Sequence, residues 1–186
     1  MTDRERIYTE LLAVRCKRGD KTAFAELVGQ WERRLYYHIR RLVDSEEEAS
    51  DILQETWMKA LNGIRSLADT SRFPAWMYGI ARHTAFSHLR RKISIRSREQ
   101  GGGDYEDIAG DDGGWSFEDA ETVHRALDKL PLLQKEILTL HFLEDLSVEE
   151  TADVIGIPVG TVKSRLFNAK RALRAIIEEG EVRHES

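Results

Sequence analysis

This sequence has a single cysteine and no recognisable pattern of metal ligands. Cys16 is the single cysteine among 186 residues, which excludes an intramolecular disulfide and leaves no zinc-binding pattern. His83 and His88 lie five positions apart, a poor spacing for sharing one metal ion on a helix face. We therefore expect no metal and no other cofactor, and we interpret Cys16 as a small buried residue.

Long apolar runs are missing too. The first residues, MTDRERIYTELL, contain no apolar signal core, and no run approaches the roughly 18 apolar residues of a membrane span. The sequence also lacks a Gly-rich phosphate loop and a nucleophile paired with a base, which argues against an enzyme. We expect a non-enzymatic protein that stays in the cytoplasm and does not insert into a membrane.

Positive charge is not in excess, since 28 Lys and Arg residues face 33 Asp and Glu residues, for a net charge of −5. The charges are nevertheless segregated along the chain. The segment from Asp44 to Glu55 carries six acids and no base, whereas the segment from Thr70 to Arg98 carries seven bases and no acid. One surface could therefore suit DNA and another a basic protein partner. The acidic run has an alternative interpretation, because acids also stabilise the start of a helix through its dipole.

The spacing of apolar residues predicts an all-α fold. Apolar positions recur at steps of three and four from Ile7 to Lys92, with helices expected over about 45–61 and from Ser71 or Phe73 to Arg91. The glycine-rich and acidic stretch GGGDYEDIAGDDGG is typical of a flexible linker. We therefore expect two small helical domains, residues 1–95 and 116–178, joined by a flexible linker over 96–115 and followed by a tail over 179–186.

The stretch from Ser147 to Arg174 is typical of a helix-turn-helix. Ser147 and Glu150 form a capping box at the start of the first helix, Gly156 ends it, and Pro158 suits the first turn of the second helix. The second helix has an apolar stripe and a basic opposite face without an acid up to Ile177. A basic face alone is usually just a solvated surface, but the turn and the capping box favour docking in a DNA groove.

Individual side chains of the second helix suggest how bases are read. Lys163 is suited to donate to guanine, Asn168 to pair with adenine and Phe167 to touch a thymine methyl group, whereas Lys170 and Arg171 are better placed for phosphates.

A second candidate nucleic-acid surface lies in the first domain. The polar connection 62–72 precedes a segment in which basic side chains are interleaved with the aromatic residues Phe73, Trp76, Tyr78 and Phe86. Aromatic and basic side chains together suit unpaired bases and their phosphates. Trp76 and Phe86 are also expected in the core, which makes the connection, Arg82 and His83 the better functional candidates.

Four motifs in the right order resemble one known family, the extracytoplasmic-function (ECF) group of bacterial RNA polymerase sigma factors. The residues that match it are Gly19, Asp20, Ala23, Phe24, Leu27, Asp51, Gln54, Glu55, Trp57, Phe73, Trp76, Ile80, Ala81, Arg90, Leu130, Pro131, Glu150, Ala152, Gly160, Thr161, Val162, Ser164, Arg165 and Leu166. The resemblance covers nearly the whole chain and implies a factor that binds core RNA polymerase and starts transcription at promoters.

The resemblance also implies roles for particular residues. It implies that the first domain binds the polymerase clamp through Asp51, Gln54, Glu55 and Trp57. It implies recognition and melting of the −10 element by Asn62, Arg65, Ser66, Asp69, Ser71, Arg72, Phe73, Trp76, Arg82 and His83. It implies recognition of the −35 element by Thr161, Lys163, Ser164, Arg165, Phe167, Asn168, Lys170 and Arg171.

The partners that the resemblance implies are the clamp and flap regions of core RNA polymerase, promoter DNA and an anti-sigma factor. The alternative hypothesis is a stand-alone helix-turn-helix transcriptional regulator, which would bind operators tightly without polymerase. The sigma factor interpretation instead predicts weak DNA binding by the free protein, because two small modules on a flexible linker contribute modestly until polymerase fixes their spacing.

Overall fold

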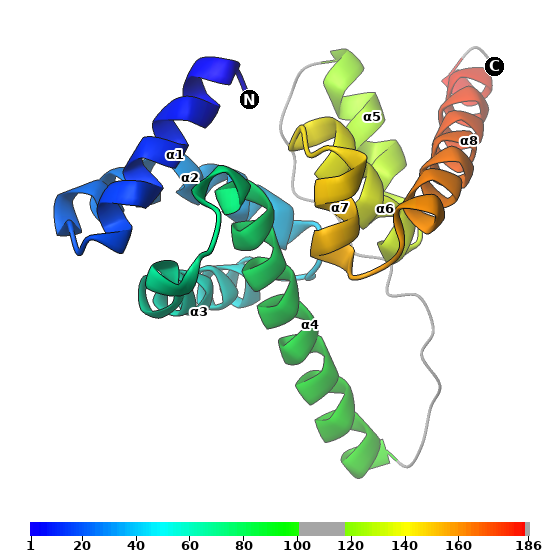
Figure 1. Ribbon diagram of the computed structural model, residues 1–186. Helices are drawn as coiled ribbons and strands as arrows, with labels where there is room; N and C mark the ends of the chain where they lie inside the picture. The colour runs from blue at the N-terminus through cyan, green and yellow to red at the C-terminus, as the bar shows by residue number, and fades with distance from the viewer. Residues whose placement is uncertain (101–117, 185–186) are drawn as a thin grey trace.

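The computed structural model describes the backbone of residues 1–100 and 118–184, and the side chains of residues 1–94 and 123–178. Every regular element in these ranges is helical, which confirms the predicted all-α fold (Figure 1). The remainder of the expected linker, residues 101–115, lies outside the described residues, as do the last two residues of the tail.

The N-terminal helical group comprises four α-helices and two short 3-10 turns. Its elements are α1 (Asp3–Lys17), α2 (Lys21–Arg40), α3 (Glu46–Gly63), η1 (Ile64–Ser66), η2 (Thr70–Arg72) and α4 (Phe73–Gln100). The helix predicted over about 45–61 is α3, which begins after its N-cap Ser45. The α4 helix continues past the predicted end at Arg91, and its last five residues fall in the stretch expected to be linker.

Polar caps and an apolar core explain why these helices form and pack. The Asp20 carboxylate caps α2 by accepting hydrogen bonds from the backbone N–H groups of Thr22 and Ala23, at 2.9 and 3.1 Å. Trp31 is fully buried, and its ring meets the rings of Phe73 and Tyr78 edge to face at centroid distances of 5.5 and 5.9 Å. This aromatic cluster fixes α4 against α2.

The C-terminal helical group contains the predicted helix-turn-helix. Its elements are α5 (Glu118–Asp128), α6 (Leu132–Leu138), the π-helical turn η3 (Thr139–Leu143), α7 (Val148–Ile155) and α8 (Val159–His184). The second predicted helix is α8, whose backbone also includes most of the expected tail.

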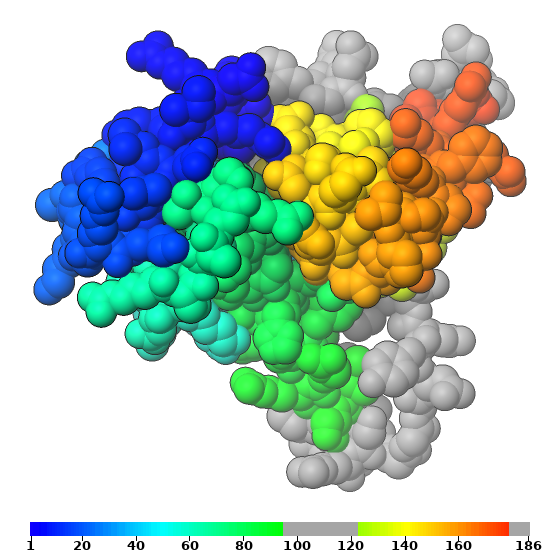
Figure 2. Space-filling view, viewed as in Figure 1, coloured from blue at the N-terminus to red at the C-terminus, as the bar shows by residue number. Residues whose placement is uncertain are grey.

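The two helical groups pack against each other. The α7 helix lies along the first turns of α4, and α1 and α2 flank the same contact (Figures 1 and 2). Buried apolar residues of both groups belong to one continuous cluster. In the part of the chain that is described, no helix is both long and apolar enough to cross a membrane.

Candidate nucleic-acid interface

The helix-turn-helix is built from a capped helix and a glycine turn. Ser147 and Glu150 form the predicted capping box, in which each side chain accepts a hydrogen bond from the other residue's N–H, at 3.0 and 2.7 Å. Gly156 ends α7 with a φ of +77°, a left-handed conformation that favours glycine, and its N–H donates to the carbonyl of Ala152. The chain then turns directly into α8.

The second helix presents a polar and basic face to solvent. Val162, Leu166 and Ala169 are buried against the other helices of the group, as the apolar stripe predicted. The exposed residues between them are Lys163, Ser164, Arg165, Phe167, Asn168, Lys170 and Arg171, while Thr161 is half-buried. All eight residues assigned to base and phosphate contacts therefore occupy one helix, and seven of them are open to a ligand. Phe167 is 64% exposed, so its ring is accessible for an apolar contact with a ligand.

One residue of this surface was missed in the sequence. Phe142, in η3, is 45% exposed, and the ammonium of Lys170 lies 4.5 Å from the centre of its ring. The His141 ring packs on Phe142 from the side, and its Nδ1 lies 2.7 Å from the carbonyl oxygen of Leu146. Nothing in the local sequence pattern indicates this contact, because it depends on how η3 packs beside α8.

The connection 62–72 has buried anchors and an exposed polar surface. Ile64 and Leu67 are buried, and the Lys17 ammonium donates to the Leu67 carbonyl. The Asp69 carboxylate accepts hydrogen bonds from the backbone N–H and hydroxyl of Ser71, which lower the pKa of Asp69. The predicted site residues that remain exposed are Asn62, Arg65, Ser66, Asp69, Ser71 and Arg72.

The two aromatic residues that follow this connection mainly support it. Phe73 is 1% exposed, and Trp76 is half-buried and packs on the Phe73 ring at a centroid distance of 5.9 Å. A Cβ atom added at Gly63 would lie 3.2 Å from the Trp76 ring, so a side chain there would press on this ring. In this conformation Phe73 offers no surface for stacking on a base.

The basic residues of α4 differ in accessibility. His83 is exposed, whereas the side chain of Arg82 is 22% exposed, stacks on the Phe86 ring and pairs with Glu136 of α6 at 2.8 Å. Arg72, just before α4, pairs with Asp153 of α7. Two arginines that the sequence assigned to DNA, Arg72 and Arg82, are therefore paired with carboxylates of the C-terminal helical group.

The acidic helix face predicted to bind polymerase is α3. Asp51 and Gln54 are exposed, but Glu55 is engaged by Lys59 at 2.7 Å and by His88 at 2.9 Å. These two contacts lower the pKa of Glu55 to about 2. Trp57 is half-buried and packs edge to face on Phe24.

The same face of α3 continues with two exposed apolar residues that sequence reasoning missed. Met58 and Leu61 are 61% and 56% exposed and follow Asp51 and Gln54 at helical spacing. Their signal in the sequence is weak, since an apolar residue near a helix end is usually assumed to face the core.

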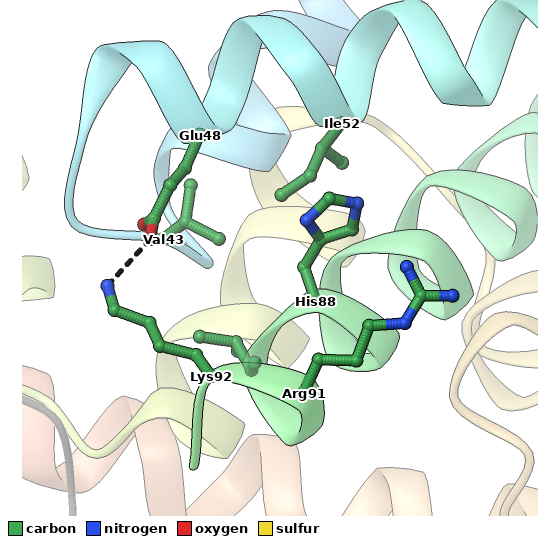
Figure 3. A pocket seen from close by; sticks show the side chains of 7 residues that line it. Val43, Glu48, Ile52, His88, Arg91 and Lys92 are labelled. Carbon is green, nitrogen blue, oxygen red and sulfur yellow. Dashed lines mark hydrogen bonds and ion pairs between the residues drawn. The ribbon is translucent and has the colours of Figure 1, made fainter. Parts of the chain in front are cut away.

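A shallow cleft of about 260 Å³ lies where the first turns of α3 cross α4 (Figure 3). Its walls include Val43, Ile52 and Leu89, and the Lys92 ammonium closes one side through a 2.6 Å ion pair with Glu48. Among the described residues no group of His, Cys, Asp and Glu side chains is arranged to hold a metal ion.

The geometry thus defines a class of protein: a two-part helical DNA-binding protein with a helix-turn-helix in its second part. Comparison with protein families is more specific, because residues 27–94 match the family Sigma-70 region 2 and residues 120–173 match the family Sigma-70, region 4. The RNA polymerase sigma-H factor of Pseudomonas aeruginosa is 36% identical over 87% of this chain and 90% of its own length. The ECF RNA polymerase sigma factor SigW of Bacillus subtilis is 31% identical over 85% of this chain and 90% of its own length.

Solved structures agree with this fold. The sigma factor RpoE of Bartonella quintana, in complex with the anti-sigma factor NepR, matches 83% of this chain and 96% of its own chain, with a TM-score of 0.69 and 25% identity. CnrH, in complex with the cytosolic domain of CnrY, shares the fold over 92% of this chain and 98% of its own, with a TM-score of 0.66 and 22% identity. The chain belongs to the ECF group of the sigma-70 family of RNA polymerase sigma factors, and the resemblance seen in its motifs is confirmed. Members of this family are transcription initiation factors.

Proposed function

We propose that this sigma factor has two functional domains. Residues 1–95 bind core polymerase and the −10 element, and residues 116–178 bind the −35 element. Residues 96–115 connect the two domains, and residues 179–186 form a tail. The observation that carries the proposal is the exposed face of α8, where seven polar, basic or aromatic side chains are available to DNA.

Recognition of the −35 element is assigned to α8. Lys163 and Asn168 contact base edges, Phe167 contacts a thymine methyl group, and Lys170 and Arg171 contact phosphates. Thr161, Ser164 and Arg165 complete the contact surface near the start of the helix. The helix-turn-helix geometry supports this division, because the first turns of the second helix face the floor of the major groove.

Recognition and melting of the −10 element are assigned to the connection 62–72 and the first half of α4. The exposed residues Asn62, Arg65, Ser66, Asp69, Ser71 and Arg72 form the surface that receives a base displaced from the stack, and Arg82 and His83 neutralise nearby phosphates. Holding that base offsets an unstacking cost of a few kcal/mol. Phe73 and Trp76 pack beneath the surface of the connection and hold its conformation, in keeping with their burial.

Binding of the polymerase clamp is assigned to the exposed face of α3. Asp51 and Gln54 supply polar contacts, and Met58 and Leu61 extend the surface with apolar area. Glu55 and Trp57 shape the same face, since their side chains pack against other residues of this group. A second contact, to the polymerase flap, is assigned to the C-terminal helical group.

We also propose that an anti-sigma factor binds this chain. Two structurally similar proteins support the proposal. RpoE was solved with the anti-sigma factor NepR, and CnrH was solved with the cytosolic domain of CnrY. The protein would act in the cytoplasm, where polymerase and promoters are, and would have no enzymatic activity of its own.

In vitro transcription tests the proposed function. Purified chain and sigma-free bacterial core polymerase are incubated with a pool of genomic promoter fragments, and the 5′ ends of the transcripts are sequenced. We expect discrete starts that share two upstream motifs about two helical turns apart. Specific DNA binding by the chain alone, without any chain-dependent start, would instead favour a stand-alone transcriptional regulator.

A further inference from the structure

Phe142 lies beside α8, although it belongs to the turn η3 that comes before α7. Its ring is 45% exposed, and the Lys170 ammonium lies over it, 4.5 Å from the ring centre. Lys170 is itself exposed and follows Phe167 by three residues, on the same side of α8. A residue outside the second helix of the helix-turn-helix therefore contacts one of the side chains assigned to DNA.

The turn that carries this ring is held by backbone hydrogen bonds and buried anchors. The N–H of Glu144 donates to the Thr139 carbonyl at 3.0 Å. The N–H of Leu146 donates to the Leu140 carbonyl at 3.1 Å. Leu140 and Leu146 are fully buried in the cluster that also contains the apolar stripe of α8. The backbone of η3 is therefore fixed in the same core as α8.

The neighbouring histidine holds the aromatic ring from the side. The His141 ring meets the Phe142 ring edge to face at a centroid distance of 4.6 Å. The Nδ1 atom of His141 lies 2.7 Å from the carbonyl oxygen of Leu146. Because a carbonyl oxygen only accepts, this nitrogen carries the proton and donates it. This hydrogen bond orients His141, and the packing of His141 in turn restricts the Phe142 ring.

A lysine held over a ring is better prepared to bind a phosphate than a free one. The side chain of lysine is long and flexible, and it loses rotamer freedom when its ammonium binds an anion. Lys170 gives up part of this freedom before DNA arrives, because the ring attracts its ammonium. The ring covers one side of the ammonium, so the remaining N–H donors can reach a phosphate.

We propose that Phe142 is a positioning residue for recognition of the −35 element, because it holds the Lys170 ammonium where a promoter phosphate binds. The inference rests on the proposed function, in which Lys170 contacts a phosphate and not a base. Phe142 acts through Lys170, so it strengthens binding to all sequences about equally and leaves base preference unchanged.

The test measures binding of holoenzyme, formed from the full chain and core polymerase, to a labelled promoter fragment that contains a −35 element. Phe142→Leu removes the aromatic face and keeps an apolar side chain, whereas the matched control Phe142→Tyr keeps the face. We expect Phe142→Leu to weaken binding about two- to fivefold, the range of an exposed cation–π contact. Phe142→Tyr should bind nearly as the unmodified chain does.

A double variant separates positioning from a general disturbance of η3. In the Lys170→Ala background, Phe142→Leu should weaken binding no further, because the ring has no ammonium to hold. Phe142→Leu alone keeps the lysine charge and should leave the salt dependence unchanged, whereas Lys170→Ala should reduce the salt slope by about one. Circular dichroism verifies that each variant is folded.

Three results would overturn the positioning role of Phe142. They are unchanged binding by Phe142→Leu, an equal loss from the leucine and tyrosine variants, and an equal loss from Phe142→Leu with and without Lys170. If Lys170→Ala itself leaves affinity and salt dependence unchanged, the phosphate contact in the proposed function is wrong, and the positioning role is rejected with it.

Discussion

At the scale of single residues, His38 is the least satisfied polar side chain of the N-terminal helical group. It is fully buried beside the Tyr78 ring, and neither of its ring nitrogens has a hydrogen-bond partner among the described residues. Burial, helped by the positive charge of Arg82, lowers the pKa of His38 to about 3. The ring is therefore neutral in the folded protein at physiological pH.

This burial predicts sensitivity to acid. The unfolded chain protonates His38 below its ordinary pKa of about 6.5, so the stability that the neutral ring contributes is present above that pH. It is lost as the pH falls toward 3, with a slope of up to about 1.4 kcal/mol per pH unit. We expect His38→Phe to flatten the fall in the free energy of unfolding between pH 6.5 and 4, measured by urea unfolding.

Glu136 and Glu144 work in the opposite direction, because their pKa values are raised. Their contribution is present below their ordinary pKa and is lost as the pH rises through the raised value. The difference between the unmodified chain and His38→Phe cancels this contribution. An unchanged slope in the variant would show that other groups set the acid sensitivity.

The exposed residues of α8 make a second prediction at this scale. Lys163→Ala and Asn168→Ala should each relax base preference at one −35 position, since a bidentate base contact discriminates by about 1–3 kcal/mol. Lys170→Ala should instead weaken binding about equally on all sequences and reduce the salt dependence, because we assign its ammonium, which lies over the Phe142 ring, to a phosphate contact. Holoenzyme binding to a randomised −35 library checks this, and equal losses for all three variants would locate the base readers elsewhere.

At the scale of elements, the sharp turn between α7 and α8 depends on one glycine. Gly156 has a φ of +77°, and a Cβ atom there would meet nothing within 4 Å, so the cost of a side chain is conformational and not steric. We expect Gly156→Ala to lower the free energy of unfolding by about 1–2 kcal/mol.

Gly160 provides the matched control for this prediction. It lies in the first turn of α8, and a Cβ atom would likewise meet nothing within 4 Å. Gly160→Ala should leave stability unchanged or raise it by up to about 1 kcal/mol, because alanine favours a helix over glycine. Equal losses from both substitutions in urea unfolding would contradict the conformational explanation.

At the scale of the whole molecule, the face of α3 assigned to polymerase stays accessible although the two helical groups pack against each other. The α3 face with Asp51, Gln54, Met58 and Leu61 is exposed even though α7 lies against α4. The surface assigned to polymerase is therefore accessible in the arrangement that the structure shows.

Charge reversal on α3 tests this contact. Asp51→Lys with Gln54→Lys should reduce affinity for core polymerase at least tenfold, about 1.4 kcal/mol, because the acidic face would become basic. Asp44→Lys, an exposed acid outside α3, is the control and should bind nearly as the unmodified chain does. Binding is measured by fluorescence anisotropy of labelled chain titrated with core polymerase, with circular dichroism to verify the fold. Retained binding by the double variant would remove α3 from its assigned role.

The sequence by itself determined the local features of the protein. Periodicity located the helices, Ser147, Glu150 and Gly156 defined the helix-turn-helix, and the basic face of α8 indicated DNA. These features are readable because a capping box, a turn and a helix face involve residues only a few positions apart. Four such motifs in order were also enough to identify the family.

Only the tertiary structure decided which of the candidate site residues are exposed and free to contact a partner. Phe73 is buried under Trp76, Glu55 is held by Lys59 and His88, and Arg82 pairs with an acid 54 positions later. Such contacts depend on how helices distant in sequence pack, which the period of a single helix does not encode. Whether a basic residue such as Arg82 is exposed or paired with a carboxylate of the same chain is therefore settled by the packing of the two helical groups.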